Sequence, residues 1–101
     1  MITVILEDHD GNELQRVACA GNEVVLFQQN PERFPLLSEL DSCSYGCFSC
    51  DQMPDLLREL ERAEKHLAAP ELSEHIRQIR EMAEKCKFSL GATLSFTPFG
   101  E

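Results

Sequence analysis

The sequence is short of basic residues and of large aromatic side chains. Its 101 residues include 9 Lys and Arg against 18 Asp and Glu, a single Tyr and no Trp. The formal net charge of −9 disfavours direct binding to nucleic acid or to anionic lipid, because Lys and Arg supply the attraction in both cases. We therefore expect no direct nucleic-acid partner and no membrane partner.

Long apolar runs are also missing. A transmembrane helix needs roughly 20 apolar residues in succession. The N-terminal apolar run ends at Leu6 and is not preceded by the basic residues that begin a signal peptide. We therefore expect a cytoplasmic protein. In that reducing compartment the five cysteines are expected to be reduced, metal-bound or redox-active rather than joined in structural disulfides.

The recognisable motifs of catalysis are absent too. The sequence has no glycine-rich phosphate loop, no Ser-His-Asp order and no carboxylate pair in a typical acid–base setting. Asp8, Asp10 and Asn12 begin like a calcium loop, but Glu13 stands at the sixth position, where such a loop needs Gly. We therefore expect a protein that is not an enzyme.

What the sequence does have is a clear pattern of strands at its N-terminus. Residues 2–6 and 14–19 alternate between apolar and polar side chains, which is typical of strands. The Asp10-Gly11 step between them favours a tight hairpin turn. Residues 24–27 form a short apolar run that predicts a third strand. The first 28 residues therefore predict an antiparallel meander.

Helical spacing dominates the rest of the chain. A short helix is predicted after Asn30. Two longer helices are predicted to begin near Asp51 and at Pro70. Because few residues lie between these two helices, we expect them to form an antiparallel hairpin. Residues 93–97 alternate again and predict a last strand. The expected fold is a single α+β domain over residues 1–101 with two layers. An antiparallel four-stranded sheet, made of the meander and the C-terminal strand, packs against the helical hairpin and the short helix.

Three cysteines lie close together in the sequence, at Cys43, Cys47 and Cys50. Their C-x3-C-x2-C spacing is that of the radical S-adenosylmethionine motif, but 101 residues cannot supply the large barrel that carries such sites. Zinc is the alternative cofactor, since three thiolates need one more ligand to complete a tetrahedral site. The candidates for that ligand are Cys86, His9, His66 and His75.

Two further interpretations of this cysteine cluster stay open. Cys47 and Cys50 stand before a predicted helix start, where the helix dipole favours a reactive thiolate, so a redox role is one of them. The other is that the cysteines pack as small apolar side chains without any cofactor. His66 and His75 flank the predicted helix hairpin, where capping or solvated roles are typical.

Part of the chain resembles a group of small bacterial proteins with no assigned activity. The shared features are an F-P-L-L, L-D, Y-G, F, Q-M progression, a helical hairpin and a closing L-x-F strand. In this sequence they are carried by Phe34-Pro35-Leu36-Leu37, Leu40-Asp41, Tyr45-Gly46, Phe48, Gln52-Met53, Leu60, Cys86 and Leu94-Ser95-Phe96. The resemblance covers residues 34–100 and implies a bacterial source and an intact domain, but no activity. Cys43, Cys47 and Cys50 are not part of the shared pattern.

The charge distribution suggests a function. Residues 1–50 contain eight acidic and two basic residues, whereas residues 51–87 contain nine and seven. We therefore expect a non-catalytic module, of the immunity-protein or antitoxin kind, that binds a basic protein partner through an acidic face, because complementary charge speeds association. The residues of this face are Glu7, Asp8, Asp10, Glu13 and Glu23.

Two other expectations belong to different classes of function. One is a metal-binding or redox-sensing protein that uses Cys43, Cys47 and Cys50. The other is a homo-oligomer that buries an apolar face of the short helix, formed by Phe34, Leu36 and Leu37.

Overall fold

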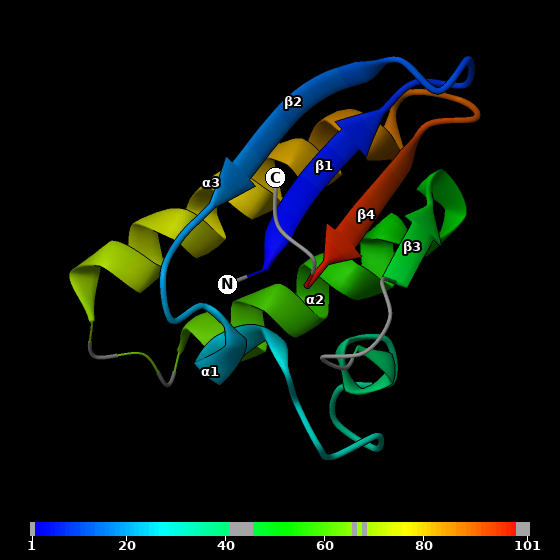
Figure 1. Ribbon diagram of the computed structural model, residues 1–101. Coiled ribbons are helices and arrows are strands. Elements are labelled where there is room, and N and C mark those ends of the chain that lie inside the picture. The colour runs from blue at the N-terminus through cyan, green and yellow to red at the C-terminus, as the bar shows by residue number, and fades with distance from the viewer. Residues whose placement is uncertain (1, 41–45, 66, 68, 99–101) are drawn as a thin grey trace.

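A four-stranded antiparallel sheet, covered on one face by two long helices, forms the body of the molecule (Figure 1). The computed structural model describes residues 2–40, 46–65, 67 and 69–98. Its elements, in chain order, are β1 Thr3–Glu7, β2 Glu13–Ala18, α1 Glu23–Leu26, the 3-10 turn η1 Leu37–Glu39, β3 Gly46–Ser49, the 3-10 turn η2 Cys50–Gln52, α2 Met53–Glu64, α3 Pro70–Lys87 and β4 Thr93–Thr97. The predicted two-layer α+β class with a four-stranded antiparallel sheet is confirmed.

The β1–β2 hairpin forms where the Asp-Gly step predicted it. Gly11 adopts a φ of 85°, in the left-handed region that glycine enters without steric cost. The Asp8 and Gly11 backbone amides donate to the carbonyls of Asn12 and Asp8, each at 3.0 Å. A register shift between Leu6 and Glu7 leaves Leu14 without a partner on β1. Below this shift the strands pair regularly, down to Thr3 opposite Ala18.

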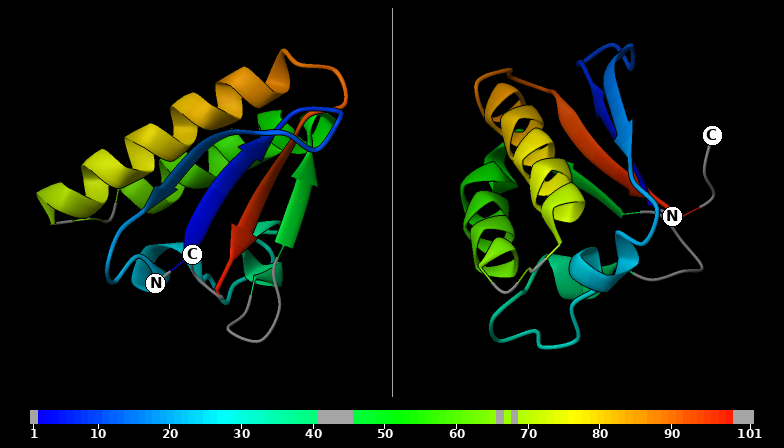
Figure 2. Two further views of the ribbon diagram at one scale, coloured as in Figure 1. Left: turned by 45° about the horizontal axis from the view of Figure 1, so that its top comes forward. Right: turned by 90° about the vertical axis from the view of Figure 1, so that its left-hand side faces the viewer.

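The sheet has the order β2-β1-β4-β3, so the last strand in sequence lies in its interior. Val4 pairs with Phe96 and Leu6 with Leu94, and all four side chains are buried beneath the helices. The prediction that residues 93–97 form a strand is confirmed. The right view of Figure 2 shows α2 and α3 together on one side of the sheet.

The predicted third strand is wrong. Residues 24–27 do not extend; Glu23–Leu26 form the short helix α1, with the Leu26 amide 2.9 Å from the Asn22 carbonyl. Val25 and Leu26 are buried while Val24 is 77% exposed, which is the spacing of a helical turn. A short apolar run cannot by itself distinguish a strand from a buried turn of helix. The fourth strand is β3, inside the segment that carries the cysteine cluster.

The short helix predicted after Asn30 is reduced to turns. The Asn30 side chain does accept hydrogen bonds from the amides of Glu32 and Arg33, as a helix cap would. Pro35 disfavours helical backbone at Phe34, however, so the first turn ends there. Only η1 follows it.

The two long helices are confirmed. Ser49 and Gln52 form a capping box ahead of α2, and Pro54 and Pro70 stand in first turns, where a missing N–H costs no helical bond. One stripe of each helix is buried against the sheet and the partner helix. The largest side chains in these stripes belong to Met53, Leu56, Leu60, Ile76, Ile79 and Met82. Full burial of such a side chain stabilises a fold by about 1.5–3 kcal/mol.

Candidate functional site

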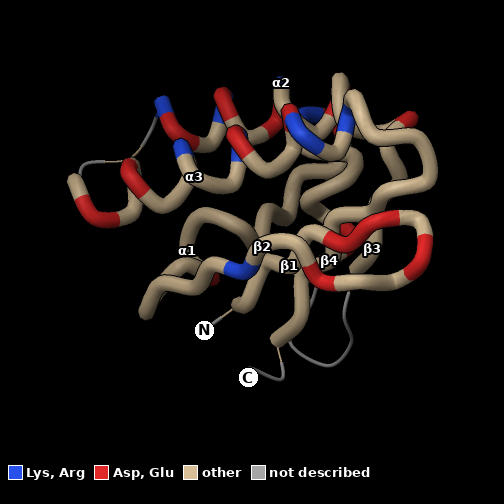
Figure 3. Tube along the Cα trace, turned by 90° about the horizontal axis from the view of Figure 1, so that it is seen from above, with Lys and Arg blue, Asp and Glu red and all other residues tan. Residues whose placement is uncertain are grey.

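The β1–β2 hairpin gathers four of the five residues of the predicted acidic face. Glu7 ends β1 and pairs with Glu13, the first residue of β2, while Asp8 and Asp10 lie in the loop between them. We call Glu7, Asp8, Asp10 and Glu13 the hairpin acids. In the view of Figure 3 they form a run of acidic backbone at the hairpin end, whereas acidic and basic residues alternate along the helices.

Glu23 does not belong to this group. It lies in α1, which follows β2. The end of β2 that leads to it is the end where Ala18 pairs with Thr3, away from the Glu7–Glu13 pair. The predicted acidic face is therefore divided between two ends of the sheet, and only the hairpin acids form a cluster.

Asp8 organises the hairpin loop. Its Oδ1 accepts hydrogen bonds at 2.9 Å from the backbone amides of Asp10 and Asn12. Its Oδ2 accepts a third bond, at 3.3 Å, from the Asn12 side-chain amide. The hydrogen bond from the Asn12 backbone amide is the main reason that the pKa of Asp8 is lowered. Asp8 thus fixes the loop in place with its charge.

The carboxylates of Glu13 and Asp10 have different partners. Glu13 binds Arg16 through two hydrogen bonds, of 2.6 and 3.1 Å, and this contact lowers the pKa of Glu13. Asp10 lies 3.4 Å from the His9 ring nitrogen, and both side chains are about two-thirds exposed. Arg16 is the only Lys or Arg within residues 2–18, so the hairpin keeps a strong excess of negative charge.

The cysteine cluster is only partly described. Cys43 lies outside the described residues. Cys47 is exposed on β3, Cys50 is half-buried against the core in η2, and Cys86 is buried in α3. Burial, together with smaller effects of the charges of Cys50 and Cys47, raises the pKa of Cys86 to about 11. Cys86 is therefore protonated at neutral pH, which makes it a poor nucleophile.

The backbone around Cys47 bears on the redox interpretation. The chain is extended from Cys47 through Ser49, whose ψ is 169°. At about 3.3 Å per extended residue the Cα atoms of Cys47 and Cys50 lie about 10 Å apart, beyond the reach of about 7 Å that a disulfide has. A disulfide between these two residues therefore requires the end of β3 to rearrange.

The zinc ligands predicted from the sequence are not brought together among the described residues. Over residues 2–40, 46–65, 67 and 69–98 no group of three or more His, Cys, Asp or Glu is placed to hold a metal ion. His9 lies in the hairpin loop and His75 is buried in α3. His66, like Cys43, is outside the described part of the chain.

His75 belongs to a buried polar network that the sequence did not indicate. It is 3% exposed, so its predicted role as a capping or solvated group is wrong. Asn22, also buried, exchanges hydrogen bonds of 2.8 and 2.7 Å with the backbone of Ile2, and its Nδ2 lies 3.0 Å from Nε2 of His75. An amide nitrogen only donates, so Nε2 accepts and His75 is neutral. Burial lowers the pKa of His75, which agrees with this state.

Glu59 is a second buried polar group. Only 2% of it is exposed, and its carboxylate accepts hydrogen bonds from the backbone amides of Leu36 at 3.1 Å and of Leu37 at 2.9 Å. Burial raises its pKa, although these two amides act in the opposite direction. The contact fixes η1 to α2. Phe34 and Leu37 are buried and Leu36 is half-buried, so these three residues do not form the exposed apolar face expected of them, while the homo-oligomer itself stays a prediction.

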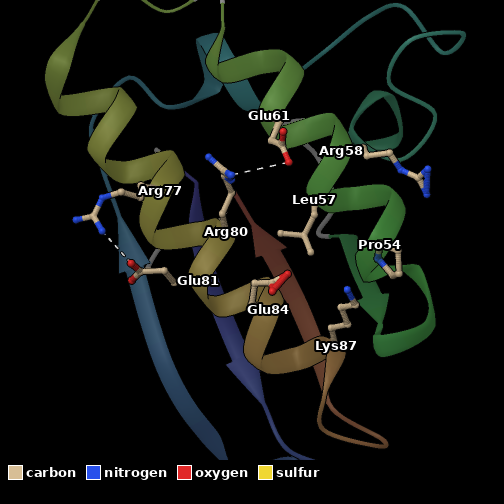
Figure 4. Close-up of a pocket in the computed structure, with 9 residues that line it drawn as sticks. All are labelled: Pro54, Leu57, Arg58, Glu61, Arg77, Arg80, Glu81, Glu84 and Lys87. Atoms are coloured by element: carbon tan, nitrogen blue, oxygen red, sulfur yellow. Dashed lines mark hydrogen bonds and ion pairs between the residues drawn. The ribbon is translucent and has the colours of Figure 1, made fainter.

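An open groove of about 590 Å³ runs between α2 and α3 on the helical surface (Figure 4). Its arginines are paired: Arg80 with Glu64 at 2.8 Å and Glu61 at 3.8 Å, and Arg77 with Glu81 at 2.8 Å. Because the charges of these arginines are matched locally, the groove does not offer a concentrated charge of either sign to a ligand.

Searches with this chain against protein-family models, curated proteins and solved structures found no match. The resemblance of residues 34–100 to a group of small bacterial proteins therefore stays a prediction. Among the described helices none is both long enough and apolar enough to cross a membrane.

Proposed function

We propose that the protein is a non-catalytic binding module that recognises a basic protein partner with the hairpin acids. The observation that supports this proposal is the position of these residues. Four carboxylates lie at one end of the sheet, and Asp8 fixes the backbone of the loop that carries them. A rigid acidic surface attracts a basic partner over the Debye length and loses little conformational freedom on binding.

The experiment compares two doubly neutralised variants with the wild-type protein. Glu7→Gln/Asp10→Asn removes two charges from the hairpin. Glu71→Gln/Glu84→Gln removes two exposed charges from α3 and has the same net charge, so it is the matched control. Each protein is immobilised and incubated with an extract of bacterial cells, and the retained proteins are identified by mass spectrometry and purified.

A supporting result is a basic protein that the wild type and the α3 control retain and that the hairpin variant loses. Its association rate constant should fall by about tenfold or more in the hairpin variant at low salt. The difference should vanish near 1 M salt, where the Debye length is about 3 Å. Equal retention by both variants, or no retained basic protein, would contradict the proposal.

The cysteines support a second candidate function. Cys47, Cys50 and Cys86 come from three different elements yet lie near enough for the charge of the first two to act on the third. We therefore keep a metal-binding or redox-sensing role for Cys43, Cys47 and Cys50 as the alternative. Elemental analysis of protein from metal-replete cells, and melting temperatures with chelator and with reductant, test it. Absence of stoichiometric metal together with unchanged melting temperatures would eliminate it.

A further inference from the structure

Two large apolar side chains stand almost fully in solvent at the turn between α3 and β4. Phe88 is 78% exposed and Leu90 is 92% exposed, whereas Leu94 and Phe96, a few residues later, are buried. The turn has a defined backbone, because the Ser89 amide donates to the Cys86 carbonyl at 3.1 Å and the Ala92 amide to the Ser89 carbonyl at 3.0 Å. The exposure of Phe88 and Leu90 is therefore a feature of an ordered turn.

This turn packs directly against the hairpin loop. Gly91 has a φ of 83°, and a Cβ atom added to it would lie only 2.7 Å from the His9 Cβ. The two loops meet at one end of the molecule in Figure 1 and again in the left view of Figure 2. Leu14, which is 57% exposed, follows Glu13 at the base of the same hairpin. Apolar and acidic side chains thus share one end of the fold.

Three positively charged side chains near this end each contact a neighbouring residue, and in the contacts described here only Arg16 meets a carboxylate. Lys87 stacks over the Phe88 ring, with its Nζ 5.4 Å from the ring centroid. Lys85 donates to the Gln15 side chain at 3.0 Å, and Arg16 binds Glu13. Protein interfaces combine a few apolar anchors, which supply most of the affinity, with a polar or charged rim. Phe88 and Leu90 have the exposure of such anchors, and the hairpin acids are placed as their rim.

We propose that Phe88 and Leu90, with the hairpin acids beside them, form one docking surface for a basic protein on which Lys and Arg surround an apolar patch. The inference rests on the proposed function and deepens it by naming the apolar anchors and the kind of surface they fit. A second copy of this chain is a poor occupant, because it would place acidic residues opposite acidic residues. An anionic lipid surface would be repelled in the same way.

The test uses a probe of stated chemistry, a lysine-rich amphipathic helical peptide with a leucine face. Two matched peptides replace either the leucines by serine or the lysines by glutamate. Binding is measured by fluorescence anisotropy for the wild type and for three variants: Phe88→Ser/Leu90→Ser, the charge variant Glu7→Gln/Asp10→Asn, and Val24→Ser. Val24 is 77% exposed in α1 and serves as the control for loss of an exposed apolar side chain elsewhere.

The wild type should bind the lysine–leucine peptide more tightly than either matched peptide. Phe88→Ser/Leu90→Ser should weaken this binding by about tenfold or more, in the range of a hot spot, while Val24→Ser leaves it unchanged. The charge variant should weaken it as well, and only at low salt. Since the replaced apolar side chains are exposed, thermal unfolding of these variants should match the wild type, which shows that the fold is intact.

The outcomes separate the two proposals. If Phe88→Ser/Leu90→Ser binds the peptide like the wild type while the charge variant binds it more weakly, the assignment of Phe88 and Leu90 as anchors is wrong and the proposed function stands. If the charge variant binds like the wild type, or the wild type fails to bind the peptide, the basic partner itself is wrong. A dimer in light scattering, or sedimentation with phosphatidylcholine vesicles, that Phe88→Ser/Leu90→Ser abolishes would assign the surface to a second copy or to lipid and overturn this inference.

Discussion

The helical layer and the β1–β2 hairpin carry the same kinds of charged side chains but use them differently. On α2 and α3 each of Arg58, Arg77 and Arg80 has a carboxylate partner within hydrogen-bond distance. On the hairpin four carboxylates share a single arginine, Arg16. Figure 3 shows the contrast as acidic and basic residues mixed along the helices and acidic residues around the hairpin loop. Residues 2–18 therefore carry four acidic residues and one basic residue, which is a third of the net charge of −9.

The largest expected effect comes from the one helical carboxylate that is buried. Glu59→Leu leaves the amides of Leu36 and Leu37 without an acceptor, and each unsatisfied buried group costs about 1–3 kcal/mol. The free energy of unfolding, from denaturant titration, should fall by about 2–4 kcal/mol. Glu59→Gln keeps an acceptor oxygen and is the control. Equal stability of the leucine variant and the wild type would show that the carboxylate does not fix η1.

The pH dependence of stability tests the other buried polar side chain, that of His75. Because burial lowers the pKa of His75, the unfolded chain takes up a proton at a higher pH than the folded protein does. The stability due to neutral His75 is therefore complete above about pH 6.5 and is lost as the pH falls through the lowered pKa of the folded state.

The variant that tests this is His75→Gln, which keeps a hydrogen-bond acceptor for Asn22 and has no proton to gain. Its free energy of unfolding should change less than that of the wild type between pH 7.5 and pH 5.5, with denaturant titrations at both values as the measurement. Glu59, whose raised pKa acts in the opposite direction, is present in both proteins. Identical pH dependence of the two proteins would exclude His75 as the source.

Asp8 is expected to have a smaller effect, confined to the hairpin. Asp8→Ala removes the acceptor for the amides of Asp10 and Asn12, both of which are exposed and can bind water instead. Amide hydrogen exchange should quicken within residues 8–12 and stay unchanged in β4. Asp8→Asn retains an acceptor oxygen, so its exchange rates within residues 8–12 should lie between those of the wild type and of Asp8→Ala. Uniformly faster exchange across the sheet would mean that the loop contributes to global stability.

The smallest effect is expected on the helical surface. Arg77→Ala breaks exposed ion pairs with Glu74 and Glu81, and such pairs contribute little in water. Thermal unfolding of Arg77→Ala should match the wild type within error, and so should its retention of a basic partner. A clear loss of partner binding by this variant would move the binding site from the hairpin to the helices.

Elements with a long, regular pattern were predictable from the sequence. Residues 93–97 alternate cleanly, and the helices starting at Met53 and Pro70 repeat apolar residues over several turns. The Asp-Gly step also gave the hairpin, and with it the placement of four acidic residues.

Short elements were not predictable, since their structure depends on distant partners. Residues 24–27 lack the length that separates a strand from a helical turn. Gly46–Ser49 contains one large apolar residue, Phe48, and becomes a strand because Leu94 lies opposite it. Glu59 and His75 look like ordinary polar helix positions, since the backbone amides of Leu36 and Leu37 and the Asn22 side chain come from other parts of the chain.

The interior position of β4 determines when this protein can fold during its synthesis. β4 supplies the pairing surface for both β1 and β3, with Thr3 opposite Thr97 and Gly46 opposite Phe96. A nascent chain that has left the ribosome only as far as α3 therefore has a β1–β2 hairpin and a lone β3, with no strand to join them. The sheet closes only once β4 is available, so folding is expected to be limited by a late, long-range insertion of this strand.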